Sequence, residues 1–208
     1  MQSGSLNTDQ AVKHMHFGGG VSTLFSAEQI SSLIKKLGNH FTLRGDCSIE
    51  IDPRAMDWPT LFKLRELGFN QVSIRSQYFN TLTQESVNYF QSVEHTLSVI
   101  DAARTMAFKS IHINLIYGLP YQTHQDFRDI LTPIIERAPD YLSLVNYARL
   151  THRHEAKKDI KGRNFSRDRD KGNQKIFLSS TEMLLKAGYV SIGDKHFSLL
   201  DDDRAIAP

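Results

Sequence analysis

The chain has 208 residues and a mass of 23.7 kDa, enough for one large domain or two small ones. Hydrophobic residues make up 40% and charged residues 23%, which excludes a collagen, a coiled coil and a wholly disordered chain. The net charge of +2 does not favour nucleic acid or an anionic membrane as a partner. No apolar run reaches the roughly 18 residues of a membrane span, and the N-terminus has no apolar signal core, so we expect a cytoplasmic protein.

Cysteine is scarce in this sequence. The chain contains one cysteine, Cys47, so these residues cannot hold an iron–sulfur cluster or a zinc ion through several thiolates, and no internal disulfide can form. Cys47 opens an expected strand, where we expect it to be buried rather than to act as a nucleophile. The pairs His14/His16 and His152/His154 have no further ligands beside them, so we expect no metal site.

Strands and helices are predicted to alternate along the chain. Apolar and polar residues alternate in five segments, which predicts strands over residues 12–17, 47–52, 71–77, 110–117 and 140–147. Apolar residues at helical spacing predict helices around residues 30–37, 61–67, 93–107 and 126–138. Ser26 and Gln29 form the pattern of a capping box before the first helix, and Pro133 is expected to interrupt or restart the last one.

This alternation predicts an α/β fold with parallel strands and right-handed crossovers. A doubly wound sheet and a (β/α) barrel both fit, and both place ligands at the C-terminal ends of strands. The polar residues expected at those ends are Gly18, Gly19, Gly20, Glu50, Asp52, Gln77, Asn114, Tyr117 and Asn146. The three glycines would let backbone N–H groups approach a ligand. Glu50 and Asp52 share one strand face, which fits a pair that binds ribose or moves protons, or an ordinary strand end.

Composition divides the chain into four parts. We expect residues 1–11 to be disordered and residues 12–150 to form the α/β core. Residues 151–174 are dense in charge with almost no large apolar side chain, which predicts a solvated linker, or alternatively a lid or a partner-binding arm. Residues 175–208 are expected to add a helix and a short strand to the core.

Six segments closely resemble one known family in their order and spacing. They are His16–Gly20, Ser48–Pro53, Gln77–Asn80, Ile116–Pro120, Asn146–Ala148 and Lys195–Phe197. The family is that of the oxygen-independent coproporphyrinogen III oxidases (dehydrogenases), which are radical S-adenosylmethionine (SAM) enzymes. The resemblance runs from about Val12 to Ala207 and covers the middle of the family's chain. It implies a partial (β/α) barrel of parallel strands in which the family's first strand and cluster loop are absent.

The resemblance also implies a chemistry. In this family a [4Fe–4S] cluster on three cysteines cleaves SAM, and the resulting radical starts the oxidative decarboxylation of coproporphyrinogen III to protoporphyrinogen IX in haem biosynthesis. The three cysteines belong to a C-x-x-x-C-x-x-C loop that has no counterpart in these residues. We therefore expect that this chain cannot assemble the cluster alone and has no catalytic residue of its own.

The resemblance assigns contacts to SAM residue by residue. They fall on Gly19, Gly20, Glu50, Gln77 and Ala148. Other family contacts are lost, because Tyr89 stands in place of an arginine and Asn114 in place of an aspartate; Val21-Ser22 also replaces Thr-Pro, and Asp194-Lys195 replaces Met-Asp. These departures predict that SAM binding is weak or lost.

Arg75 replaces a small residue inside the family's barrel. It shares a strand face with Gln77, so it should point inward with that residue. A guanidinium in a barrel interior must reach an anion or water, and Glu50 on the neighbouring strand is the nearest candidate. We therefore expect an Arg75–Glu50 ion pair in part of the space that SAM uses, or else a bulge that turns Arg75 outward.

Two functions fit this sequence. The chain is either a fragment or diverged relative that cannot perform the family's chemistry alone, or a non-enzymatic module that binds a nucleotide or a tetrapyrrole. In both, the expected partner is a small molecule rather than nucleic acid or a membrane. We also expect residues 12–17 to form an exposed sheet edge, which predicts a homo-oligomer or a complementing chain at that strand.

Overall fold

A single sheet organises the chain. The computed structural model describes residues 11–19, 25–76, 81–87, 90–147 and 167–199. Its seven strands lie in the order β1-β2-β3-β4-β5-β7-β6. Their bounds are β1 Ala11–Phe17, β2 Thr42–Ile51, β3 Gln71–Ser76, β4 Ser110–Tyr117, β5 Tyr141–Asn146, β6 Tyr189–Ser191 and β7 His196–Leu199. Neighbours from β1 to β5 pair in parallel, which confirms the partial (β/α) barrel of parallel strands.

The two C-terminal strands depart from this pattern. β7 pairs antiparallel with β5, and β6 pairs antiparallel with β7. The sequence predicted one short strand after the last helix, whereas the structure has two, and both are antiparallel to their neighbours. The connection from β6 to β7 is too short for a crossover, so the chain turns back beside itself. Gly193, with φ of +108°, lies in this turn, and its missing side chain permits that backbone conformation.

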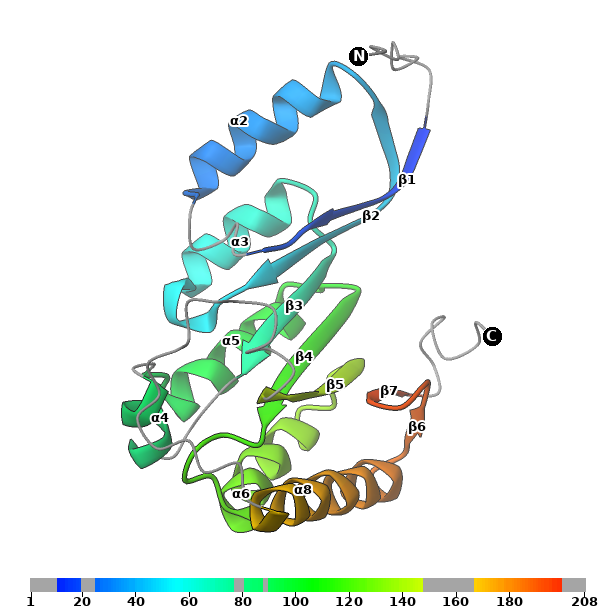
Figure 1. The fold of residues 1–208 in the computed structure, drawn as a ribbon. Coiled ribbons are helices and arrows are strands. Elements are labelled where there is room, and N and C mark those ends of the chain that lie inside the picture. The colour runs from blue at the N-terminus through cyan, green and yellow to red at the C-terminus, as the bar shows by residue number, and fades with distance from the viewer. Residues whose placement is uncertain (1–10, 20–24, 77–80, 88–89, 148–166, 200–208) are drawn as a thin grey trace, which may run out of the picture.

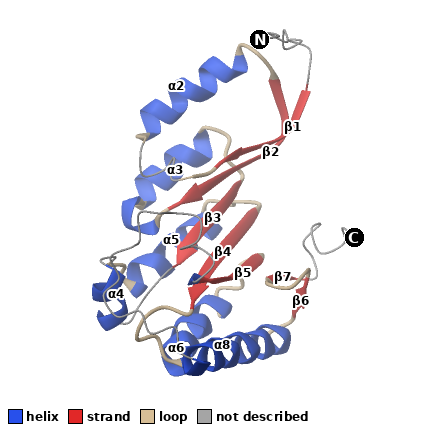
Figure 2. Ribbon diagram, in the orientation of Figure 1, coloured by secondary structure: helices blue, strands red, loops and turns tan. Residues whose placement is uncertain are grey.

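The helices lie on one side of the sheet, and the other side faces away from them (Figures 1 and 2). They are α2 Ala27–Gly38, α3 Trp58–Glu66, α4 Thr81–Val87, α5 Val93–Thr105, α6 His124–Ile135 and α8 Arg167–Lys186, with a 3₁₀ turn at Pro53–Ala55. Among the α-helices of the described residues, only α4 has no counterpart among the predicted helices, because its polar sequence has no apolar periodicity. None of the helices in the described ranges is long and apolar enough to cross a membrane.

Local signals fix where the helices begin. The Ser26 side chain accepts the Gln29 N–H and the Gln29 side chain accepts the Ser26 N–H, so the predicted capping box is confirmed. Thr123 and Asp126 form a second box, which starts α6 earlier than predicted. Pro133 lies inside α6, which continues to Ile135, so the expected interruption was wrong.

Two predicted boundaries need correction. Ala11 belongs to β1, although it was expected to end the disordered N-terminus, 1–11. α8 starts at Arg167, inside the segment 151–174 that was predicted as a linker. Charged residues such as Lys and Arg have good helix propensity, so a charged stretch can extend a helix without any apolar periodicity. Residues 151–166 lie outside the described residues, and so does most of the N-terminal segment.

The hydrophobic core lies between the sheet and the helices. Alternate residues of β3 and β4, of the C-terminal half of β2 and of most of β5 are apolar and almost fully buried on this helix-covered face, which we call the outer face. These residues are Cys47, Ile49, Ile51, Val72, Ile74, Ile111, Ile113, Leu115, Leu142 and Leu144. From the helices, Leu61, Leu64, Ile100 and Phe127 belong to the same core. The alternate residues of these strands therefore form the opposite face, which no helix covers in Figure 1.

Candidate functional site

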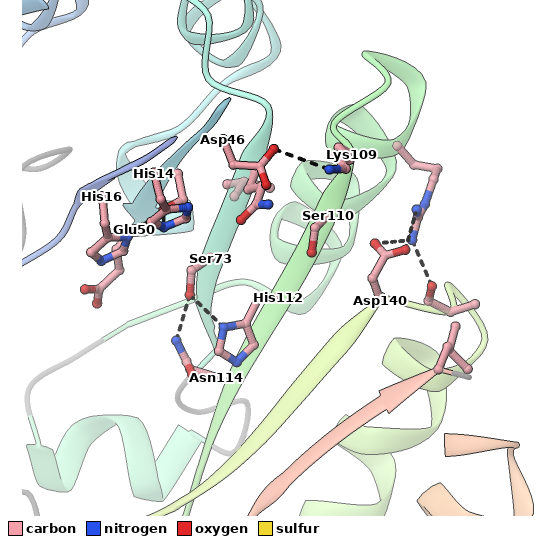
Figure 3. Close-up of a pocket in the computed structure, with 16 residues that line it drawn as sticks. His14, His16, Asp46, Glu50, Ser73, Lys109, Ser110, His112, Asn114 and Asp140 are labelled. Carbon is pink, nitrogen blue, oxygen red and sulfur yellow. Dashed lines mark hydrogen bonds and ion pairs between the residues drawn. The ribbon is translucent and has the colours of Figure 1, made fainter. Parts of the chain in front are cut away.

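Polar side chains line the face of the sheet opposite the helices, which we call the inner face. They come from neighbouring strands and include His14, His16, Ser48, Glu50, Ser73, Arg75, His112, Asn114, Ser143 and His196. Several of them line a hollow of about 840 Å³ that spans β1 to β4 and reaches Asp140, just before β5 (Figure 3). A cavity of this size is in the usual range for a small-molecule site. The inner face is therefore the candidate site.

Glu50 lies at the C-terminal end of β2 and joins three parts of the fold. Its Oε1 accepts a hydrogen bond from Nη2 of Arg75 on β3, so the predicted ion pair is confirmed. Its Oε2 accepts the backbone N–H of Gly19 at 3.3 Å, in the turn that follows β1. Gly19 has a φ of +70°, which favours glycine at this position. Both carboxylate oxygens therefore have partners within the chain.

The structure brings together only part of the residues assigned by resemblance. Gly19 and Glu50 are in contact, as described above. Gly20, Gln77 and Ala148 lie outside the described residues. Asp52 does not share a site with Glu50, because β2 ends at Ile51 and the strand alternation ends with it.

Asp52 instead stabilises the turn after β2. Its side chain accepts the Arg54 N–H at 3.0 Å, which caps the short 3₁₀ helix. It also forms an ion pair with the Arg54 guanidinium at 2.6 Å. These contacts give Asp52 a structural role, so the interpretation of Glu50 and Asp52 as a shared ribose or proton site was wrong.

A chain of hydrogen bonds crosses the inner face from β3 to β7. Asn114 donates from Nδ2 to Ser73 Oγ at 2.9 Å, and Ser73 Oγ lies 3.4 Å from His112 Nδ1. His112 Nε2 lies 2.8 Å from Ser143 Oγ, which in turn lies 2.8 Å from His196 Nδ1. Figure 3 shows the Ser73, His112 and Asn114 part of this chain. These contacts fix the side chains of four strands relative to one another.

A second group of polar contacts links β1 to β2. His16 Nδ1 lies 2.8 Å from Ser48 Oγ, and His14 Nε2 lies 3.4 Å from the same oxygen. Both histidines therefore have Ser48 as a hydrogen-bonding neighbour. No group of three or more His, Cys, Asp or Glu residues within the described ranges could hold a metal ion.

Sequence reasoning missed both of these networks. The available signal was the alternation of polar residues along each strand, for example Ser73 with Arg75 and His112 with Asn114. That alternation predicts which residues share a face, but it does not give the register between strands.

Paired charges occupy the N-terminal end of the same hollow. Asp46 accepts a hydrogen bond from Asn70 at 3.1 Å and lies 3.4 Å from the Lys109 ammonium. Asp140 forms an ion pair with Arg104 at 3.1 Å and accepts the Ile111 N–H at 2.8 Å. Figure 3 shows these two ion pairs beside the strand starts. Each carboxylate that lines the hollow is thus bound by a cation of the chain.

Cys47 faces away from this site. It is almost fully buried in the outer-face core, and burial raises the pKa of its thiol from 9.0 to about 11. A cluster ligand must be a thiolate that reaches the metal, together with two further cysteines in this family. Cys47 meets neither condition, so the described residues do not fit a [4Fe–4S] cluster.

Comparison with known proteins identifies related chains. The family model described as "Radical SAM superfamily" matches residues 5–134. The chain is 42% identical to an oxygen-independent coproporphyrinogen III oxidase of Pseudomonas aeruginosa, over 97% of this chain and 44% of the relative. It is 38% identical to the relative of the same name from Escherichia coli K12, over 94% of this chain and 43% of the relative. The chain thus spans less than half the length of these relatives.

Solved structures agree with the architecture. A structure of coproporphyrinogen III oxidase from Escherichia coli matches with a TM-score of 0.85 and 36% identity, over 95% of this chain and 45% of that chain. Methylornithine synthase matches with a TM-score of 0.52 but only 15% identity, which is a likeness of fold alone. The partial barrel and its resemblance to the coproporphyrinogen oxidases are therefore supported by sequence and by structure.

Proposed function

Because the chain belongs to the radical SAM superfamily, we propose that its 208 residues form one wall of a coproporphyrinogen-oxidase-like barrel and do not perform radical chemistry by themselves. The observation that carries this proposal is the position of Cys47, the one cysteine of the sequence. It is buried on the outer face, on the opposite side of the sheet from the polar hollow. A cluster would have to lie beside a ligand in that hollow in order to pass an electron to it.

Anaerobic reconstitution with iron and sulfide tests this proposal. The chain and its Cys47→Ser variant should give the same spectrum, without the broad visible absorbance of a bound iron–sulfur cluster. Iron and sulfide analysis after gel filtration should find neither element in stoichiometric amounts. A stoichiometric cluster in the native chain that disappears in Cys47→Ser would overturn the proposal.

Ligand binding without catalysis is the second candidate function. The hollow of about 840 Å³ favours it, because it has the size of a small-molecule site and carries polar side chains that hydrogen bonds hold in place (Figure 3). The resemblance to coproporphyrinogen oxidases suggests a nucleotide or a tetrapyrrole as the ligand. Calorimetric titrations with S-adenosylhomocysteine and with haem test it directly. Saturable binding of either compound with a stoichiometry of one is the expected result, and heats of dilution alone for both would exclude this function.

SAM itself is expected to bind weakly. The family's arginine is Tyr89 here, and its aspartate is Asn114, an uncharged amide that donates to Ser73. Glu50 is held by Arg75, so it is not available to a cationic ligand unless that ion pair opens. A charge-assisted hydrogen bond contributes roughly 1.5–3 kcal/mol, so losing two such bonds should weaken binding about a hundredfold or more. Micromolar binding of two SAM molecules per chain would contradict this expectation.

A further inference from the structure

Two arginines near the hollow differ in how fully they are bound. Arg104 donates to both oxygens of Asp140 and to the carbonyl of Ala138. The Arg75 guanidinium donates only to Glu50 in the part of the chain that the structure describes. A guanidinium has five N–H donors in a rigid fork, so most of the donors of Arg75 have no partner among the described residues. Its side chain is 38% exposed, which leaves these donors open to a ligand.

Arg75 also lies where a ligand is expected. It is the second-last residue of β3, at the C-terminal end of a parallel strand. Ligands of parallel α/β folds bind at this end of the sheet. The Gly19 N–H donates to one oxygen of Glu50, and Arg75 donates to the other. Glu50 therefore holds Arg75 in place and leaves its remaining N–H donors unused.

Acceptor groups of the inner face are already in use. Glu50, Asp46 and Asp140 each bind a cation of the chain, as described above. The histidine rings contact serines. A cationic ligand would therefore meet carboxylates whose charge is already balanced by a cation of the chain, whereas an anionic ligand would add bonds to Arg75 without breaking any.

We propose that Arg75 makes the C-terminal rim of the inner face an anion-binding site, which takes a carboxylate or phosphate group of a small-molecule ligand. Arg75 is then a specificity-determining residue, because it neutralises Glu50 and turns a rim that would favour cations into one that favours anions. The inference rests on the proposed ligand-binding role of the hollow. It goes beyond that role by naming the charge of the ligand and the residue that selects it.

Calorimetry at low salt with inorganic phosphate and with citrate tests this inference without any nucleotide. The native chain should bind at least one of the two anions, and Arg75→Gln should weaken that binding about tenfold or more. Arg75→Lys keeps the charge and should retain part of the affinity. Glu50→Gln removes the competing carboxylate and should strengthen binding several-fold. Lys35→Gln is the matched control, because it removes one positive charge from an exposed position on α2, on the helix side of the sheet.

The outcomes separate this inference from the proposed function. Tighter binding of phosphate indicates a phosphorylated ligand, and tighter binding of citrate indicates a carboxylate. The inference is wrong if neither anion binds, or if Arg75→Gln binds them as well as the native chain does. Titration with S-adenosylhomocysteine tests the ligand-binding role separately. Binding of that compound without Arg75-dependent anion binding would contradict the inference about Arg75 and would still support the ligand-binding role. Circular dichroism establishes that each variant is folded.

Discussion

The outer and inner faces of the β1–β5 sheet are made from alternate residues of the same strands, yet they carry opposite kinds of side chain. On β3, Val72 and Ile74 are buried under the helices, whereas Ser73 lines the hollow and Arg75 pairs with Glu50 on the inner face. On β4, Ile111 and Ile113 contrast in the same way with His112 and Asn114. A polar group on a sheet face costs stability unless it is hydrogen-bonded. The outer face therefore stabilises the fold, and the hydrogen-bonded polar inner face is the one that we propose for binding.

The largest expected difference between the two faces is the loss of stability when a side chain is truncated. Ile74→Ala removes a fully buried side chain from the outer face and should lower the free energy of unfolding by about 2–5 kcal/mol. Ser73→Ala on the inner face removes one hydroxyl with two hydrogen-bonding neighbours, and should cost about 1 kcal/mol. Urea unfolding followed by circular dichroism measures both. Equal losses of unfolding free energy at Ile74 and Ser73 would contradict the claim that the outer face is the one that stabilises the fold.

A substitution at Gly45 tests how closely β1 and β2 approach each other. A Cβ atom at this position would lie 1.8 Å from the Lys13 carbonyl oxygen, where the register of β1 and β2 shifts. Gly45→Ala should therefore push the two strands apart and destabilise the chain by about 1–3 kcal/mol. Gly38→Ala is the matched control, because a Cβ atom added there would meet no other atom within 4 Å and the φ of Gly38 is not positive. Similar melting temperatures for the two variants would contradict the close approach of these strands.

Arg75→Gly should change affinity more than it changes the fold. It frees Glu50 to meet the positive charge of SAM, so the affinity for SAM should rise about tenfold. It also leaves Glu50 without its cation and adds a flexible residue to a strand, so the melting temperature should fall. Calorimetry and thermal denaturation measure the two effects. If neither quantity changes, Arg75 does not control the rim.

Replacing Cys47 should have the smallest effect on stability, and that effect should depend on pH. Burial raises the pKa of its thiol from 9.0 to about 11, so the folded state holds the proton more tightly than the unfolded state. The resulting contribution to stability is complete below pH 9 and is lost as the pH rises towards about 11. Cys47→Ala should lose stability less steeply in this range, as measured by urea unfolding. Rapid labelling of the native thiol at neutral pH would show that the side chain is not buried.

The sequence predicted the elements better than it predicted their contacts. Strands such as Ser110–Tyr117 have long, regular alternation, and the observed β4 has the predicted bounds. The Arg75–Glu50 pair could also be predicted, because it needs only the strand order and the two-residue period. The contact of Ser143 with His196 spans 53 residues and requires the antiparallel β7, which no local pattern indicated. Register across several strands is a tertiary property, so single-strand periodicity does not specify it.

Chemical-shift mapping tests most directly whether the inner face is the binding face. A ¹H–¹⁵N spectrum of the chain should be recorded during titration with S-adenosylhomocysteine, and again with the anion that binds more tightly. The account predicts that the largest shifts fall on Gly19, Glu50, Ser73 and Arg75, while outer-face residues such as Ile74 and Leu64 change little. Shifts concentrated on the helices, or no shifts with either compound, would contradict the account.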